Sequence, residues 1–315
     1  MSVPTLLDIA KLDAGIGYPL IEEAVKLAPE LMVVPADTIL GTTMELTVRS
    51  GLPSVRFRNA NEGVPRSKST YETRTFQTHI LDHQVAVDEQ IVGGARDKGR
   101  LLENHASGAM EAAMQYIGSQ FYYGTGNDTK GFPGLLAQCK SDAAHTVDAA
   151  GAASKTSVWF LRLGRECVEF LFGNGQTVRL NDTWELETVY DDNGNPYKAY
   201  TNWMKGRVGM RLANKNCAVR IKNLEEAGTN KKTLNDSLLY SAYEKFTEFG
   251  FEPTHIFMNG RSREQLRNSR TATTTNGTPA PLPTEWEGHS DHPHRLHRQR
   301  RGLIPKLSIN LHPLI

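Results

Sequence analysis

The spacing of apolar residues predicts one long helix near the middle of this chain. Between Asp97 and Tyr123, apolar residues recur at three-and-four spacing and form one continuous stripe. Asp97 stands where a helix N-cap is expected, and Gly124 stands where a left-handed C-cap residue is common. Gly108 and Gly118 each weaken a helix, so we expect another element to approach closely at both positions. The stripe consists of Leu102, Ala106, Ala109, Met110, Ala113, Met114, Ile117 and Phe121.

Strict alternation of apolar and polar residues predicts a long antiparallel hairpin ahead of this helix. Residues 44–59 and 71–89 alternate with a period of two, and the turn-rich segment 60–69 separates them. An isolated hairpin buries too little apolar surface to be stable in water, so it needs a surface to lie against. That surface is either its own domain or a neighbouring subunit. The residues that we assign to this contact are Arg56, Arg58, Asn59, Asn61, Glu62, Arg66, Lys68, Tyr71, Glu72 and Arg74.

The second half of the chain mixes helical and strand patterns. Residues 154–172 carry apolar residues at helical spacing and predict a helix. The runs TVRL, TWELETVY, YKAYTNWM, GRVGMRL and CAVRI predict strands, and DDNGNP between two of them predicts a hairpin turn. LNDSLLYSAYEKFTEFG and RSREQLRNSR predict helices on either side of a short buried strand, THIFMNG. Two brief amphipathic helices are predicted within the first forty residues, and 271–283 predicts a loop.

The charge distribution argues against a protein that grips nucleic acid. The formal net charge is +1, but residues 289–315 hold five basic residues against one aspartate. The rest of the chain is therefore slightly acidic, whereas proteins that bind nucleic acid through its phosphates usually have a basic body. No apolar run approaches the ~18 residues that a membrane span needs, and no secretory signal pattern opens the sequence.

Motifs that would carry catalysis or metal binding are missing from the sequence. The odd number and wide spacing of Cys139, Cys167 and Cys217 fit buried thiols in a reducing compartment. The closely spaced histidines at 292–297 have no partners to complete a zinc site. GTGNDTKGFPGL lacks the spacing of a phosphate-binding loop, and DDNGNP has no closing glutamate for a calcium loop. We therefore expect no enzyme, no cofactor and no metal.

Four segments carry a resemblance to a known family. SGLPSVRFRNANEGV, KSTYETR, SQFYYGT and GFPGL resemble a group of tailed-bacteriophage major capsid proteins, whose fold is named for phage Hong Kong 97. The resemblance covers roughly residues 5–288, and RFRNANEGV is its most specific part. It implies an α+β chain of the Hong Kong 97-type capsid fold. The implied parts are an N-terminal arm (1–41), an extended loop (42–90), a peripheral domain with the spine helix (91–129), an axial domain (130–232), a return to the peripheral domain (233–270) and a C-terminal segment (271–315).

The resemblance also implies a function and a set of partners. The chain would assemble with itself into hexamers and pentamers of an icosahedral head that encloses double-stranded DNA without sequence-specific binding. A separate scaffolding protein and a portal would be further partners, with assembly in the host cytoplasm and no membrane. The open alternatives are another phage ring, tube or encapsulin-like shell component and, third, an α+β enzyme.

The last residues depart from the resemblance. One interpretation is a basic tail that touches nucleic acid. Another follows from the genetic code: read one nucleotide later, 289–303 permits a strand-like string with an acidic end, which leads to the hypothesis that 289–315 is a frameshift product. The hypothesis predicts that residues after Gly288 do not pack like the rest, and the coding DNA decides it.

Overall fold

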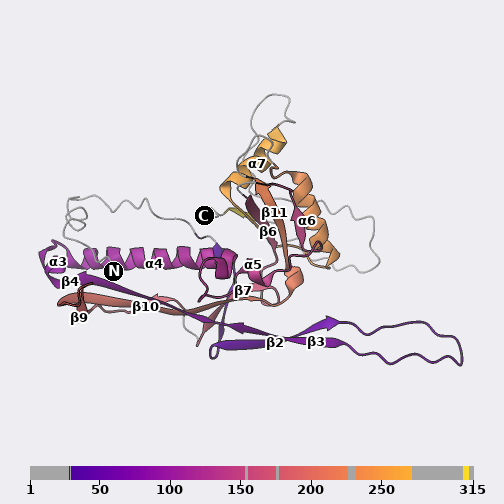
Figure 1. Ribbon diagram of the computed structural model, residues 1–315, viewed down its shortest axis with the longest axis horizontal. Helices are drawn as coiled ribbons and strands as arrows, with labels where there is room; N and C mark the ends of the chain where they lie inside the picture. Colours follow the sequence, from indigo (N-terminus) through magenta and orange to yellow (C-terminus); the bar gives the residue numbers. More distant parts are fainter. Residues whose placement is uncertain are drawn as a thin grey trace.

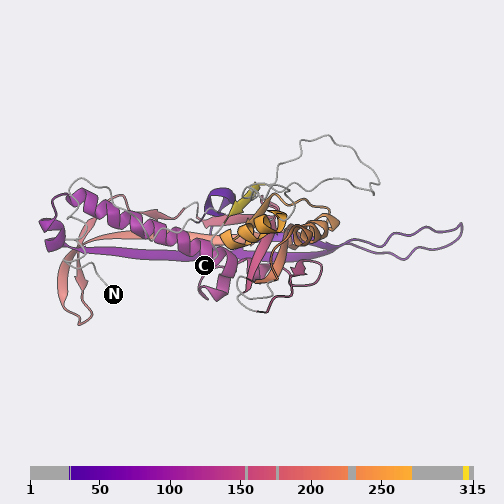
Figure 2. The same ribbon diagram turned by 90° about the horizontal axis from the view of Figure 1, so that it is seen from above.

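The protein is elongated, with two sheets, one long helix and a projecting hairpin (Figure 1). The computed structural model describes residue 28 and residues 30–152, 155–174, 177–225, 232–271 and 308–311. Most of the predicted arm, 1–41, lies outside these residues, as do the predicted loop at 272–283 and the histidines at 292–297. In both views the hairpin extends beyond the rest of the described chain (Figures 1 and 2).

The first sheet is built around one very long strand, β10 (Pro196–Leu212). It contains both YKAYTNWM and GRVGMRL, which the sequence predicts as separate strands. Antiparallel pairing with β4 runs from Ala199↔Asp88 to Val208↔His79. The predicted DDNGNP hairpin is confirmed, because β9 pairs with β10 across this turn and Gly194 adopts a φ of +82°. The other strands of the sheet are β1 (Ala36–Ile39), β4 (His79–Asp88), β7 (Val168–Gly173), β8 (Arg179–Leu180) and β9 (Glu185–Tyr190).

The predicted long helix is confirmed as α4 (Lys98–Tyr123). The Asp97 side chain accepts a hydrogen bond from the amide of Arg100, and Gly124 ends the helix with a φ of +53°. Gly118 is approached closely by α2 (Glu30–Val33), because a Cβ built there would lie 3.2 Å from the carboxyl carbon of Glu30. At Gly108 the same expectation is not met within the described part of the chain, since none of those residues lies within 4 Å of a Cβ at that position. The short helices around α4 are α2 (Glu30–Val33), α3 (Glu89–Gly94), η1 (Gly124–Gly126) and α5 (Leu135–Gln138).

One face of α4 packs on the first sheet and continues into the largest core. Ala113, Ile117 and Phe121 are buried as the stripe predicted, but Met114 is 48% exposed. The ring of Phe121 lies 5.3 Å from that of Phe170 on β7. Both belong to a buried cluster that also includes residues of the second sheet. The helix and the two sheets therefore share one continuous core, which fixes their relative placement.

The second sheet has the order β13-β12-β6-β11-β5 and is covered by α6 and α7 (Figure 1). The side chain of Asn235 caps α6, and its apolar stripe packs against β5, β6 and β11. Leu239 and Phe246 on this helix are fully buried with Ile221 of β11. The elements are β5 (Thr146–Asp148), β6 (Lys155–Leu161), η2 (Lys215–Cys217), β11 (Ala218–Glu225), α6 (Asp236–Glu248), β12 (His255–Met258), α7 (Gly260–Thr271) and β13 (Ser308–Leu311).

Two expectations from the sequence differ from this arrangement. The helix predicted over 154–172 is wrong: these residues form β6 and β7, which are buried on both faces and so lack the alternation of a half-buried strand. Within the predicted axial domain (130–232), β7 to β10 join the first sheet beside the long helix, where β10 pairs with β4; α6 packs on the second sheet. The backbone of Ser308–Leu311 pairs in parallel with β12, whereas the frameshift hypothesis predicts that residues after Gly288 do not pack like the rest.

Candidate subunit interface

The predicted hairpin is confirmed, and it is shorter than the alternation indicated. β2 (Thr43–Gly51) and β3 (Thr70–Gln77) pair antiparallel from Thr43↔Gln77 to Gly51↔Thr70. The second alternating run, 71–89, is divided between two sheets, because β4 leaves the hairpin and joins β10. The projection is therefore residues 43–77, and its non-strand tip is 52–69, which we call the tip loop.

A small apolar cluster holds the base of the hairpin. Phe76 is buried against Ile39 of β1 and Leu171 of β7, with Met44 and Leu46 packed at the edge of the same cluster. Further along the projection, the side chains of β2 and β3 become exposed, and nearly every residue of the tip loop is exposed. The hairpin is thus anchored at one end only.

The tip loop is shaped by hydrogen bonds of its own. Asn61 has a φ of +67°, which asparagine tolerates better than most residues, at the third position of a turn closed by Glu62 N–H to Asn59 O. The Glu62 carboxylate accepts from the amide of Asn59 at 3.0 Å. The Arg58 guanidinium donates to Glu62 O at 2.9 Å, and that of Arg56 donates to Gly63 O at 3.1 Å. These bonds shape the tip without help from the rest of the chain.

The tip loop exposes apolar side chains that nothing in the described chain covers. Leu52 is 76% exposed, Val55 90% and Phe57 fully exposed. Single exposed apolar residues are common on protein surfaces, but three on one narrow projection form a surface that gains stability when another molecule covers it. Four basic side chains and the single carboxylate of Glu62 surround them, so the covering surface should tolerate or attract positive charge.

Two of the residues assigned to the contact lie at the base instead of the tip. Arg74 is largely buried and donates to the backbone oxygen of Ala213 at 2.9 Å, and it lies 3.3 Å from Glu72. The hydrogen bond from Arg74 lowers the pKa of the Glu72 carboxyl. Arg74 therefore anchors the hairpin to its own chain. The remaining assigned residues divide between the tip loop (Arg56, Arg58, Asn59, Asn61, Glu62, Arg66 and Lys68) and the exposed start of β3 (Tyr71).

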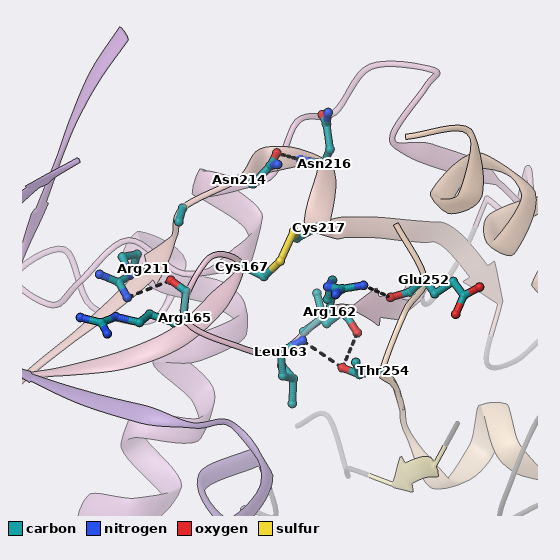
Figure 3. The surroundings of a disulfide bond; sticks show 12 residues. Arg162, Leu163, Arg165, Cys167, Arg211, Asn214, Asn216, Cys217, Glu252 and Thr254 are labelled. Carbon is teal, nitrogen blue, oxygen red and sulfur yellow. Dashed lines mark hydrogen bonds between the residues drawn. A yellow bond between two sulfur atoms is a disulfide. The ribbon is translucent and has the colours of Figure 1, made fainter. Parts of the chain in front are cut away.

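Sequence reasoning missed the charged pair beneath this base. Arg211, near the end of β10, is 1% exposed and forms an ion pair with buried Glu169 of β7. It also donates to Arg165 O at 2.9 Å (Figure 3) and to the sulfur of Met44 on β2. Desolvation lowers the pKa of Arg211. The sequence does contain a signal for this pair. VEFLF and GRVGMRL are strongly apolar runs that each contain a charged residue, and a buried charge requires a partner.

The described residues do not assemble an evident catalytic or metal centre. His145 contacts the Asp142 carboxylate through Nδ1 and the Asn216 side-chain oxygen, at 3.0 Å, through Nε2, so both ring nitrogens are occupied. Burial raises the pKa of the Cys139 thiol to about 12, which keeps it protonated. No group of three metal-ligating side chains occurs in the part of the chain that the structure describes. Within the same residues, no helix is long and apolar enough to cross a membrane.

The expectation of three free thiols is wrong for two of them. Cys167 and Cys217 form a disulfide, with their Cα atoms 5.5 Å apart (Figure 3). A separation of 50 residues in sequence concealed this pairing, which depends on the meeting of two distant loops. Cys139 is free.

Comparison with known proteins supplies the family context. The family model described as major capsid protein GP7 matches residues 25–282. A solved structure from bacteriophage Epsilon15 has 17% sequence identity and a TM-score of 0.69, covering 100% of this chain and 96% of that one. A structure from Mycobacterium phage Bobi has 16% identity and a TM-score of 0.47, covering 69% and 97%. No curated protein sequence matches. The Epsilon15 likeness confirms the predicted α+β, Hong Kong 97-type capsid fold.

Proposed function

Because this chain belongs to the family of major capsid protein GP7 of tailed phages, we propose that it assembles as hexamers and pentamers into an icosahedral head around double-stranded DNA. The observation that carries the proposal is the hairpin at 43–77, an anchored projection with an exposed apolar tip. A sister subunit is the covering surface that a self-assembling shell supplies. Ring contacts of this kind are heterologous, since one patch binds a different patch on the next copy.

The parts of the fold take roles in this assembly. We assign the projection to the extended loop, and α4 with the first sheet to the peripheral domain. The second sheet, with α6 and α7, becomes the axial domain that meets its copies around each capsomer axis. This division follows the packing, and it moves 168–212 and α6 relative to the boundaries expected from the sequence. Of the proposed N-terminal arm, 1–41, the residues of β1 belong to the first sheet and so to the peripheral domain.

The proposed partners follow from the same role. The slightly acidic composition before residue 289 suits a wall that contains DNA without clamping it. We propose that the chain binds packaged double-stranded DNA without sequence preference, that a separate scaffolding protein and a portal act during assembly, and that assembly takes place in the host cytoplasm. The protein itself functions in the virion as a structural component.

Electron microscopy of the purified full chain tests the assembly directly. Closed shells of uniform size support the proposal, and nuclease-protected double-stranded DNA in particles from infected cells supports DNA enclosure. Open rings or tubes would indicate that the protein forms a different phage component instead of the head. A 35 kDa monomer at all concentrations in sedimentation would contradict self-assembly and return attention to an α+β enzyme.

Two charge reversals separate the tip from the base. Arg58→Glu should reduce particle yield while leaving the melting temperature of the unassembled chain unchanged, because Arg58 is exposed at the tip. Arg74→Glu should lower the melting temperature itself, because it replaces the donor to Ala213 O with a carboxylate. A normal particle yield from Arg58→Glu would contradict the placement of the tip at a subunit contact.

A further inference from the structure

The disulfide Cys167–Cys217 joins the two strand-to-strand connections between the sheets. Residues 162–167 lead from β6 in the second sheet to β7 in the first, and residues 213–217 lead from β10 in the first sheet to β11 in the second. Each cysteine is the last residue of its connection. Figure 3 shows the sulfur bridge where these two connections approach each other.

Hydrogen bonds already pair the same two connections reciprocally. The amide of Ala213 donates to Cys167 O at 2.8 Å, and the amide of Arg162 donates to Cys217 O at 3.0 Å. Both sulfurs belong to side chains that are at least 96% buried in the core shared by the sheets. The covalent bond therefore joins two connections that backbone hydrogen bonds also hold together.

The base of the projecting hairpin is tied to the same place. Arg74 on β3 donates to Ala213 O in one connection. Arg211 donates to Arg165 O in the other connection and to the sulfur of Met44 on β2. One bond between the connections thus restrains the first sheet, the second sheet and the root of the projection together.

We propose that Cys167 and Cys217 form a redox clasp that is open as two thiols during synthesis and closes as a disulfide once the protein meets an oxidising medium. Cytoplasmic thiols are kept reduced, whereas disulfides persist outside the cell. The timing rests on the proposed function, in which assembly precedes release from the host. The chemistry of the clasp does not depend on that function.

The closing reaction is thiol–disulfide exchange with a small disulfide such as oxidised glutathione. One cysteine thiolate attacks a sulfur of the small disulfide, forming a mixed disulfide and releasing one small thiolate. The second cysteine thiolate then attacks the bound sulfur of the first, which forms the intramolecular bond and releases the second small thiolate. Two cysteine protons are lost, and the small disulfide is reduced to two thiols. Because the cysteines are buried, the reaction needs a transient opening of the two connections.

The test compares one protein in two redox states. The purified full chain is incubated with oxidised glutathione or with dithiothreitol, then denatured with an alkylating agent and weighed by mass spectrometry. The oxidised sample should carry one alkyl group, on Cys139, and the reduced sample three. The oxidised form should melt about 5–10 °C higher. Amide exchange at Arg162 and Ala213 should accelerate on reduction.

Two variants and two protein samples from infected cells complete the design. Cys139→Ala should keep the full redox shift, while Cys167→Ala and Cys217→Ala together should abolish it. Protein from host cells lysed directly into denaturant with the alkylating agent should carry three alkyl groups, and particles aged in aerated medium and then treated in the same way should carry one. Three alkyl groups in every oxidised sample, or equal melting of the two forms, would overturn the clasp.

The clasp and the proposed function can fail separately. One alkyl group on protein trapped inside the host would refute the timing alone. If neither redox form assembles but the melting shift is present, the shell function fails and the clasp stands. If shells form and melting is insensitive to redox state, the clasp fails and the shell function stands.

Discussion

Truncation of Phe57 to alanine should weaken assembly strongly and leave the isolated subunit intact. The side chain is fully exposed on the tip loop, so its removal costs the subunit no buried contact. Surface changes of this kind usually alter the free energy of unfolding by less than about 0.5 kcal/mol. If a sister subunit covers the ring, the same change removes roughly 2 kcal/mol of burial from that contact. Each subunit contributes one such tip.

The expected effect on assembly follows from this loss. Since 1.4 kcal/mol corresponds to about a factor of ten, the critical concentration for assembly should rise roughly 30-fold. Sedimentation velocity across a concentration series measures this value, and thermal melting of the unassembled chain measures the subunit. Phe57→Leu keeps most of the apolar area and should restore most of the loss. Phe121→Ala is the opposite control, because that buried ring should cost the fold about 3–5 kcal/mol.

Two outcomes would contradict this prediction. A critical concentration for Phe57→Ala within threefold of the parent, with particles of normal appearance, would show that no subunit covers the ring. A lowered melting temperature of the unassembled chain would show that the tip packs on its own subunit. Either outcome would remove the observation on which the shell function rests.

Two further predictions concern the fold that carries the tip. Gly124→Ala should lower the melting temperature, because Gly124 has a positive φ and a Cβ there would lie 2.1 Å from the amide nitrogen of Gly134. Gly108→Ala should raise the free energy of unfolding by up to about 1 kcal/mol, because no described residue lies within 4 Å of a Cβ at that helix position. Equal melting temperatures of the two variants would contradict this prediction. Arg211→Met alone should lower the free energy of unfolding by about 3–5 kcal/mol, because it leaves Glu169 buried without its partner. Adding Glu169→Met should recover much of that loss in thermal melts. A double variant that is less stable than Arg211→Met alone would contradict this prediction.

The sequence predicted correctly those features that depend only on residues close together in the chain. The caps at Asp97 and Gly124 delimit α4 correctly because capping involves only the first and last turns. The DDNGNP turn is correct because the φ of Gly194 and the side chain of Asp191 determine it within six residues. Strand and helix patterns were confused only where burial on both faces removed the alternation, as in β6.

The remaining features depend on pairings between distant parts of the chain. Nothing local to β4 indicates that it leaves the hairpin for β10, more than a hundred residues later. The disulfide and the Arg211–Glu169 pair likewise unite residues separated by about 40–50 positions. The alternation pattern placed the tip between its two runs, but it did not distinguish tip from base, because that distinction depends on where the paired strands end. Gly51 marks that end.

The tip can act as a contact only because the base is rigid. A projection whose arms are about 15 residues long reaches on the order of 50 Å, so a small rotation at its root displaces the tip by several ångströms. Phe76, Arg74 and Arg211 attach that root to three separate elements, and two of these attachments end on the connections that the disulfide joins. Opening the clasp should therefore change where the tip points before it changes whether the chain is folded. On this argument, reduction and tip truncation affect the same subunit contact through different mechanisms, since reduction alters its geometry and truncation alters its strength. The critical concentration of the reduced Phe57→Ala variant should therefore rise by no more than the product of two factors, the rise caused by reduction alone and the rise caused by truncation alone.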